Sequence, residues 1–200
     1  MTTNSKRLLV LIVGPSGSGK STLERDLAAN YSDYYSRVIS HTTRKPREGE
    51  VDGKNYHFTS KRKFVKMKKE NKFLENVEFN GNLYGCSIEE IERINKNKKD
   101  AILIVEPNGL AQILKKIEKE HLPFTPLVIY MDISKKYLES NMRLRGDSEE
   151  EIQKRLNDGI KESFEEKKIN PDIVVNRLYK NLYKNIQNQI FMWKKIYLKD

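Results

Sequence analysis

The 200-residue sequence has almost no cysteine, because Cys86 is the only one. A single thiol excludes an intrachain disulfide and any metal site built from several cysteines. It is also typical of a protein kept in a reducing, intracellular compartment. We therefore expect a cytoplasmic protein.

Long hydrophobic runs are absent as well. The most apolar segments are LLVLIV at 8–13, AILIV at 101–105 and LVIYM at 127–131. Each is far shorter than the roughly 20 residues of a membrane-spanning helix. Basic residues precede the first segment, as in a signal peptide, but that segment runs directly into a glycine-rich loop and is interpreted as a buried strand. No membrane association is expected.

Acidic side chains are the minority charge, with 28 Asp and Glu against 38 Lys and Arg, which gives a net charge of +10. This charge is compatible with a polyanionic partner. The lysines are distributed along the chain, however, and no recognisable RNA- or DNA-binding motif is present. We interpret the charge as a lysine-rich surface and do not expect nucleic acid as a partner.

Apolar runs alternate with amphipathic segments, which is typical of a parallel sheet flanked by helices. Strands are predicted near 8–13, 37–40, 101–105, 127–131 and 173–175. Helices are predicted near 20–30, 86–98, 109–120, 134–143, 148–168 and 178–197. The polar stretch 41–85 contains short alternating segments and predicts a small mixed β lobe inserted into the core. The expected organisation is one domain, 1–200, with a core at 1–40 and 86–200, the inserted lobe at 41–85 and a lid at about 132–156.

The segment GPSGSGKST, Gly14–Thr22, matches G-x-x-x-x-G-K-[ST] between a predicted strand and a predicted helix. Glycines let successive backbone N–H groups point at phosphate oxygens, and the following helix adds the positive end of its dipole. Lys20 would reach the β and γ phosphates, and the Ser21 hydroxyl would ligate Mg²⁺. This P-loop predicts a bound nucleoside triphosphate. The residues expected to bind it are Gly14, Ser16, Gly17, Ser18, Gly19, Lys20, Ser21 and Thr22.

A P-loop by itself does not distinguish a motor, a switch and a kinase. Residues 40–58 place Arg44 and Arg47 on either side of Pro46, which stiffens the local backbone. Two guanidinium groups held in this way can clamp one phosphate. A solvated basic loop is an equally good interpretation of these residues alone.

Taken in order, GPSGSGKST, TTRKPREGEVDGKNYHF, FLE at 73–75, LYG at 83–85 and VVN at 174–176 resemble the guanylate kinase family across nearly the whole chain. The resemblance implies an α/β fold, with a P-loop parallel sheet flanked by helices, a mixed β lobe for the acceptor and a helical arginine lid. It implies a transferase that moves the γ-phosphate of ATP to GMP or dGMP, with Mg²⁺.

The resemblance also assigns roles to residues of the acceptor lobe. Glu75 would accept hydrogen bonds from guanine N1–H and N2–H₂, because a carboxylate offers two acceptors to two parallel donors. Glu50 would brace the arginines rather than touch the substrate. Asn176 would lie near the donor adenine, with a capping or turn role as the alternative. The residues expected to hold the acceptor phosphate are Ser40, Arg44, Arg47, Tyr56 and Tyr84.

The sequence departs from the family pattern at the base-reading positions. Cys86 stands where the family usually has Ser or Thr, and Ser87 is the candidate substitute. The family's Asp-x-Asp at the end of the third core strand is Ile104-Val105-Glu106, so the carboxylate associated with metal and phosphates is missing. Glu106 occupies the position of the carboxylate that contacts guanine.

The arginine lid, RLRGDSEEEIQKRL, fits the family only with about three residues removed. Arg143 and Arg145 are both candidates for the first arginine positions, and Arg155 aligns with the third. Arginines at these positions would neutralise charge around the transferred phosphoryl group. A salt-bridged helix surface is the alternative interpretation.

Three rival functions are considered beside guanylate kinase activity. The acceptor could be another deoxy or modified nucleoside monophosphate. The chain could be a catalytically silent, protein-binding relative, although the intact P-loop and the clamp arginines oppose this. A kinase acting on polynucleotides, or a nucleic-acid-binding protein, would suit the basic charge but has no motif in its support.

Overall fold

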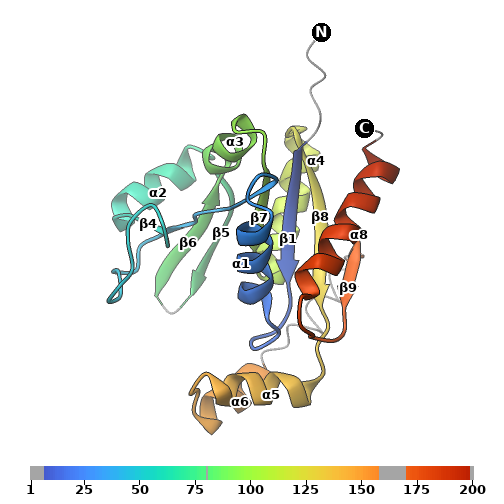
Figure 1. Cartoon of the computed structure of the whole chain (residues 1–200). Coiled ribbons are helices and arrows are strands. Elements are labelled where there is room, and N and C mark those ends of the chain that lie inside the picture. The colour runs from blue at the N-terminus through green and yellow to red at the C-terminus, as the bar shows by residue number, and fades with distance from the viewer. Residues whose placement is uncertain (1–6, 80, 158–169, 199–200) are drawn as a thin grey trace.

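The computed structural model of the protein describes residues 7–79, 81–157 and 170–198. It contains a five-stranded sheet with strand order β2-β7-β1-β8-β9 and a four-stranded sheet with order β4-β3-β6-β5. The two sheets lie side by side, and a helical segment projects from the lower end of the first (Figure 1). This arrangement is the α/β fold that the sequence predicts.

All strand pairs of the first sheet are parallel. Its strands are β1 (Arg7–Val13), β2 (Tyr35–Arg37), β7 (Asp100–Ile104), β8 (Phe124–Met131) and β9 (Ile173–Val175). The central strand β1 is buried along nearly its whole length. A parallel sheet covered by helices on both faces needs such continuous apolar strands, which explains the runs in the sequence.

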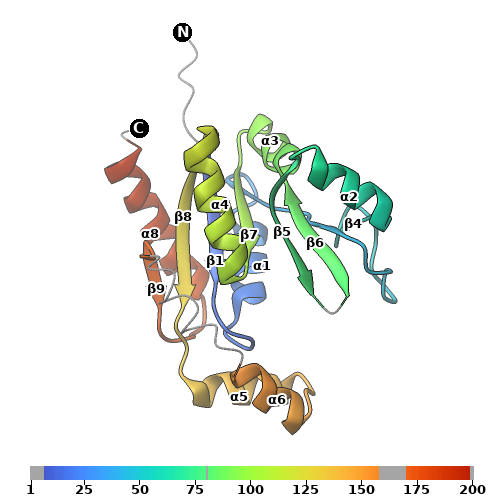
Figure 2. The same cartoon turned by 180° about the vertical axis from the view of Figure 1, so that it is seen from behind.

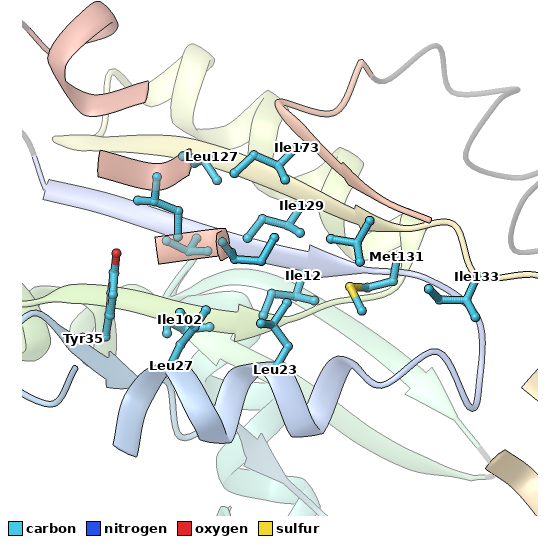
Figure 3. Packing of buried hydrophobic residues seen from close by; sticks show 14 of the residues in the cluster. Ile12, Leu23, Leu27, Tyr35, Ile102, Leu127, Ile129, Met131, Ile133 and Ile173 are labelled. Carbon is cyan, nitrogen blue, oxygen red and sulfur yellow. The ribbon is translucent and has the colours of Figure 1, made fainter. Parts of the chain in front are cut away.

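Helices cover both faces of this sheet (Figures 1 and 2). On one face, α1 (Lys20–Asn30) and α8 (Leu182–Tyr197) pack on alternate residues of β1, including Ile12, which meets Leu23 (Figure 3). On the other face, α3 (Ile88–Lys96) and α4 (Pro107–Glu120) pack on the remaining ones. The described helices include none that is long and apolar enough to cross a membrane.

The second sheet is mixed. Its strands are β3 (His41–Thr42), β4 (His57–Phe58), β5 (Phe73–Phe79) and β6 (Asn82–Ser87). β3 and β4 are parallel, whereas β6 runs antiparallel to both β3 and β5. A helix that the sequence analysis did not predict, α2 (Lys61–Lys69), packs on this sheet through Phe64 and Met67.

Several predicted boundaries need correction. The strand predicted at 37–40 is wrong, because β2 is Tyr35–Arg37 and residues 38–40 carry the chain from the first sheet to the second. The helix predicted at 86–98 begins only at Ile88, since Cys86 and Ser87 still pair with β5. The helix predicted at 178–197 begins at Leu182, after a turn with Asn181 at a positive φ of 62°.

The remaining predicted elements are close to those observed. The helix predicted at 20–30 is α1, and the strand predicted at 173–175 is β9. The helix predicted at 148–168 corresponds to α6 (Glu149–Leu156), and its second half lies outside the described residues. α5 (Lys135–Leu144) precedes α6, and we call this helical pair the lid helices.

Candidate active site

The P-loop joins the carboxyl end of β1 to α1, as the sequence predicts. Gly17 and Gly19 have positive φ angles of 80° and 87°, and Gly19 is the N-cap residue that precedes α1. A Cβ atom on Gly17 would lie 2.8 Å from the carbonyl oxygen of Leu138. Only glycine therefore satisfies both the backbone conformation and the space at this position.

This geometry makes a direct prediction for stability. Gly17→Ala is expected to lower the free energy of unfolding by about 2–4 kcal/mol, because left-handed strain adds to a clash with a rigid carbonyl. Gly49→Ala is the matched control, since Gly49 has a φ of 78° but no atom within 4 Å of its would-be Cβ. The control should lose only about 1–2 kcal/mol in urea unfolding. Equal losses in the two variants would contradict the proposed clash.

The polar groups of the P-loop suit a phosphate ligand. The Lys20 ammonium donates hydrogen bonds to the carbonyls of Gly14 and Pro15, which hold it beside the loop. The Ser18 hydroxyl is fully buried and has no hydrogen-bond partner among the residues that the structure describes. A buried, unpaired hydroxyl within a curl of backbone amides is costly unless an acceptor-rich group satisfies it.

The P-loop also offers oxygen donors at the start of α1. Ser21 and Thr22 are exposed in its first turn, and Ser16 is half-buried within the loop. Hydroxyl oxygen is a suitable ligand for Mg²⁺, which keeps most of its waters and takes few protein ligands. The described residues contain no cluster of three or more His, Cys, Asp or Glu that could hold a metal unaided. The chain therefore fits Mg²⁺ that arrives with a phosphate.

A second polar cluster lies on the second sheet. The Arg44 guanidinium contacts Glu50 Oε1 at 2.8 Å, and the Arg47 backbone N–H donates to Glu50 Oε2 at 2.7 Å. These hydrogen bonds lower the pKa of the Glu50 carboxyl. Arg44 also lies 5.5 Å from the ring centroid of Tyr56, which meets Tyr84 edge-on at 6.1 Å. The structure thus brings together four predicted phosphate ligands and the glutamate expected to brace them.

The fifth predicted phosphate ligand, Ser40, lies in the crossing between the two sheets and is half-buried. Its carbonyl accepts a hydrogen bond from the His57 backbone at 2.9 Å. This bond ties the crossing to β4, one residue after the Tyr56 of the cluster. Ser40 is therefore linked, through its hydrogen bond to His57, to the segment that carries Tyr56.

Glu75 is a buried carboxyl at the junction between the two sheets. Its Oε1 accepts a hydrogen bond from the Cys86 N–H at 2.9 Å, and its Oε2 lies 3.2 Å from the Cβ position of Gly109 in α4. Burial raises the pKa of Glu75 to about 7 from its usual 4.5. This carboxyl therefore changes charge near neutral pH.

A β-bulge explains how Glu75 reaches α4. The register of β5 against β6 shifts between Phe73 and Glu75, so Leu74 is an extra residue. Strict alternation would return Glu75 to the face that carries Phe73 and α2. The bulge instead lets Leu74 and Glu75 both turn toward the parallel sheet, where Leu74 joins the core and Glu75 pairs with Cys86.

The polar atoms of Cys86 and Ser87 already have local partners. The Cys86 thiol is fully buried and lies 3.7 Å from the Ser87 carbonyl, and burial raises its pKa well above its usual value. A neutral, buried thiol is not a nucleophile. The Ser87 hydroxyl accepts a hydrogen bond from the Glu90 N–H at 3.3 Å and so caps α3. This capping role was not predicted from the sequence.

At the end of β7, the sequence departs from the family's Asp-x-Asp pattern. Ile104 is the last residue of β7 and packs partly against the core. Glu106 is exposed and stands at the N-terminus of α4, with Pro107 in the first helical position. Gly109, which backs Glu75, lies one turn further along this helix. Glu106 and Glu75 are thus associated with the same end of α4.

The lid helices carry three predicted arginines, each paired with a carboxylate. Arg143 contacts Glu149 at 2.6 Å, whereas Arg145 and Arg155 contact the same oxygen of Asp147, the latter at 3.5 Å. The alternating charges of RLRGDSEEE are a signal for such pairs, but not for which residues pair. Two guanidinium groups that share one carboxylate oxygen are arranged to bind a small anion.

The lid helices are joined directly to the P-loop. The Asn141 side-chain amide donates to the Gly17 carbonyl at 2.7 Å, next to the contact of Gly17 with Leu138. Nothing in the sequence pattern indicated this contact, because it joins residues 124 positions apart. A hydrogen bond therefore links α5 directly to the phosphate-binding backbone.

Asn176 follows β9 and is exposed. Two residues later, the Leu178 side chain lies 3.3 Å from the Cβ position of Gly19. The loop after β9 is thus adjacent to the P-loop. The P-loop, Glu106, the lid helices and this loop all follow strands of the parallel sheet, whose carboxyl ends are where ligands bind in open α/β sheets.

Comparisons with known proteins agree with this geometry. The family model described as guanylate kinase matches residues 5–192. A guanylate kinase of Schizosaccharomyces pombe is 37% identical over 182 residues, which cover 89% of this chain and 87% of that protein. Guanylate kinase 1 of Oryza sativa subsp. japonica is 39% identical over 148 residues, or 74% of this chain but only 37% of the rice protein.

Among solved structures, a guanylate kinase from Anaplasma phagocytophilum superposes with a TM-score of 0.62 at 20% identity. The match covers 98% of this chain and 88% of that one. At this identity, the likeness shows a shared fold. It extends over both sheets and the lid helices rather than over the P-loop alone.

Proposed function

The chain belongs to the guanylate kinase family, and on that basis we propose that it transfers the γ-phosphate of ATP to GMP, with dGMP as a second acceptor. The observation that carries the proposal is an intact P-loop together with a buried carboxyl, Glu75, on the same second sheet as the cluster of Arg44 and Glu50. A P-loop alone would explain the binding of ATP, but it would not explain the binding of an acceptor phosphate and of the hydrogen-bonding edge of guanine.

For the donor, we propose that the P-loop amides, Ser18 and Lys20 bind the phosphates of ATP. Asn176 would contact the adenine from the loop after β9. Mg²⁺, held through Ser21, would neutralise charge on the β and γ phosphates. Two carbonyls hold Lys20 beside the loop, and its ammonium would turn from them to a phosphate oxygen.

For the acceptor, we propose that Arg44 and Arg47 clamp the GMP phosphate with help from the hydroxyls of Ser40, Tyr56 and Tyr84. Arg44 supplies the charge, and Glu50 keeps its guanidinium oriented. Because Arg44 is largely covered by its neighbours, its position costs little further ordering on binding.

The guanine base would lie against Glu75, whose carboxylate matches the N1–H and N2–H₂ donors. Glu106, Cys86 and Ser87 complete the proposed surroundings of the base. The hydroxyl of Ser87 caps α3 as an acceptor and still has its own hydrogen to donate to an oxygen of the base.

The proposed transfer depends on the lid. Arg143, Arg145 and Arg155 would exchange their carboxylate partners for phosphate oxygens as the lid helices close over ATP. The link from Asn141 to Gly17 would transmit the arrival of phosphate to α5. Closure excludes water and aligns the two phosphates, so positioning and charge neutralisation account for the reaction without a covalent intermediate.

We also propose a three-part division of this single domain, with the core at 1–40 and 86–200, the acceptor lobe at 41–85 and the lid at about 132–156. The separate second sheet and the projecting lid helices support this division. A cytoplasmic location is proposed from the single, buried cysteine.

The experiment that tests the function is a comparison of acceptors. Phosphoryl transfer from saturating ATP and Mg²⁺ is measured separately with GMP, dGMP, AMP and dTMP. GMP is expected to give the highest kcat/KM. Turnover of another nucleotide without GMP turnover would favour a different base, as Cys86 and Ile104 allow, and no turnover of any nucleotide would favour a silent binding protein.

The bracing role of Glu50 gives a separate prediction. Glu50→Gln is expected to raise the KM for GMP about tenfold, because a glutamine has one acceptor oxygen and cannot accept from both the Arg44 guanidinium and the Arg47 backbone as the carboxylate does. The KM for ATP should stay within about twofold, because the change lies in the acceptor lobe. Steady-state kinetics with each substrate varied will show this, and Glu48→Gln, an exposed neighbour, is the matched control. An equal rise in both KM values would contradict the role.

A further inference from the structure

Basic residues concentrate in one short segment of the chain. Residues 61–72, which contain α2 and the turn after it, hold seven basic residues and one acidic residue, Glu70. The segment therefore carries a net charge of +6, more than half of the +10 of the whole chain. The expectation that the lysines are distributed along the chain is wrong here.

Packing directs these charges to one surface. Phe64 is fully buried and stacks on the Phe73 ring at a centroid distance of 4.3 Å, and Met67 is buried beside it. The opposite side of α2 must then face outward. There, a shallow hollow around Val65 is lined by four basic side chains. We call this surface, formed by Lys61, Arg62, Val65, Lys66 and Lys69, the outer face of α2.

The charges on this face are poorly neutralised within the chain. Glu70 contacts Lys66 at 3.8 Å and Lys72 at 2.8 Å. Among the described residues, no carboxylate forms an ion pair with Lys61, Arg62 or Lys69. Like charges three or four positions apart on a helix destabilise it. The outer face of α2 therefore keeps a repulsion that a bound polyanion would relieve.

We propose that the outer face of α2 binds nucleic acid through the phosphate backbone, without reading sequence, as a function separate from phosphoryl transfer. Phosphate binding needs only repeated cations, and release of counterions supplies its free energy. Successive helical turns separate the charges by about 5.4 Å along the axis. Contact with the phosphate backbone of a nucleic acid requires no sequence-recognition motif, which agrees with the absence of a recognisable RNA- or DNA-binding motif in the sequence.

An anionic membrane and a protein partner fit the outer face of α2 less well. A helix that lies on an anionic membrane inserts large apolar side chains, and a stable protein interface is centred on aromatic or aliphatic anchors. The outer face of α2 offers only Val65, which is 36% exposed, since Phe64 and Met67 are used in the fold. Nucleic acid can be bound through its phosphates without an inserted apolar side chain or an aromatic or aliphatic anchor.

The location leaves this face free of the proposed reaction. α2 lies on the side of the second sheet away from the parallel sheet and the lid helices, as both views show (Figures 1 and 2). The P-loop and the lid helices belong to the opposite part of the molecule. A bound polymer at α2 would therefore not block the P-loop.

Binding is tested by fluorescence anisotropy with a short labelled DNA duplex and a single-stranded RNA of equal length, without nucleotides. If about four phosphates are neutralised, the affinity should fall roughly 100-fold between about 50 and 200 mM salt. A variant that lacks the four basic side chains of the outer face of α2 should bind at least tenfold more weakly, and its affinity should depend less steeply on salt concentration. Its substitutions are Lys61→Gln, Arg62→Gln, Lys66→Gln and Lys69→Gln.

The matched control removes the same number of charges from exposed lysines on α4 and α5. Its substitutions are Lys115→Gln, Lys119→Gln, Lys135→Gln and Lys136→Gln. This control should bind nucleic acid as the unchanged chain does, and the α2 variant should keep its kcat for GMP, which shows that it is folded.

Three results would overturn the proposal: no binding at low salt, an equal loss in both variants, or binding to phosphatidylserine vesicles but not to nucleic acid. Because the binding assay contains no nucleotide, its outcome is independent of the acceptor assay. A chain that failed to phosphorylate GMP would still give a clear result here, with circular dichroism of the variant as the check of folding.

Discussion

A Lys20→Met variant is expected to transfer phosphate about 100- to 1000-fold more slowly than the unchanged chain. Lys20 is the one side-chain cation of the P-loop, and removing a preorganised donor to a developing charge typically costs about 2.7–4 kcal/mol of transition-state stabilisation. Methionine keeps the length of the side chain, so the change mainly removes charge. The measurement is kcat with GMP and ATP both saturating.

Two controls separate a chemical effect from misfolding. GMP affinity, measured by calorimetry without ATP, should be unchanged in Lys20→Met, because the acceptor cluster lies on the second sheet. Lys136→Met removes an exposed cation from α5 and should keep nearly full activity. A kcat within tenfold of the unchanged chain in Lys20→Met would contradict the role of this lysine.

Glu75→Gln is expected to weaken GMP binding about 100-fold and, at the same time, to stabilise the free protein at alkaline pH. The first effect follows because a glutamine retains one acceptor but presents an N–H₂ group to a guanine donor. Losing one charge-assisted hydrogen bond and opposing another corresponds to roughly 3 kcal/mol. The measurement is the KM for GMP, with the KM for ATP as the internal control.

The second effect follows from burial. The pKa of Glu75 is about 7 in the folded chain, against about 4.5 for an exposed carboxyl. A raised pKa means that the stability associated with the protonated form is fully present below about pH 4.5 and is lost as the pH rises through about 7. The difference corresponds to on the order of 3 kcal/mol. Glutamine never ionises and can still accept from the Cys86 N–H, so the variant should unfold at higher urea concentration at pH 8.

The pH dependence of GMP binding distinguishes this account from a purely steric one. In the unchanged chain, the KM for GMP should rise about tenfold per pH unit below pH 7, because guanine needs the ionised carboxylate. Protonation of the GMP phosphate affects the unchanged chain and the variant alike, so Glu75→Gln should show a shallower rise. Parallel profiles, or a variant less stable at pH 8, would contradict the assigned role.

The features that local rules can describe were accessible from the sequence. β1, the P-loop and α1 follow one another without interruption: β1 is an apolar run, the P-loop has the glycine and lysine spacing of a phosphate-binding loop, and α1 begins where that loop ends. The clamp of Arg44, Glu50 and Tyr56 also lies within thirteen consecutive residues. Neighbours in sequence remain neighbours in space, so a pattern of residue types was sufficient there.

The missed elements depend on contacts between distant segments. α2 is not predicted from the sequence because the segment is rich in lysine and buries only two residues, Phe64 and Met67. Their role becomes apparent only when they pack against Phe73. The strand predicted at 37–40 was misplaced because Val38 and Ile39 are apolar, yet lie where the chain changes sheet. Ser87 was interpreted through the acceptor base, whereas its hydroxyl also caps a helix.

Residue identity alone determined that this chain is an α/β protein with a phosphate-binding loop, because hydrophobic period and glycine placement are local properties of the chain. Tertiary structure decided the chemistry of the site. A single bulged residue, Leu74, turns the Glu75 carboxyl toward α4, and burial there brings its pKa close to neutrality. Desolvation depends on every group that surrounds a side chain, and those groups come together only when both sheets are folded.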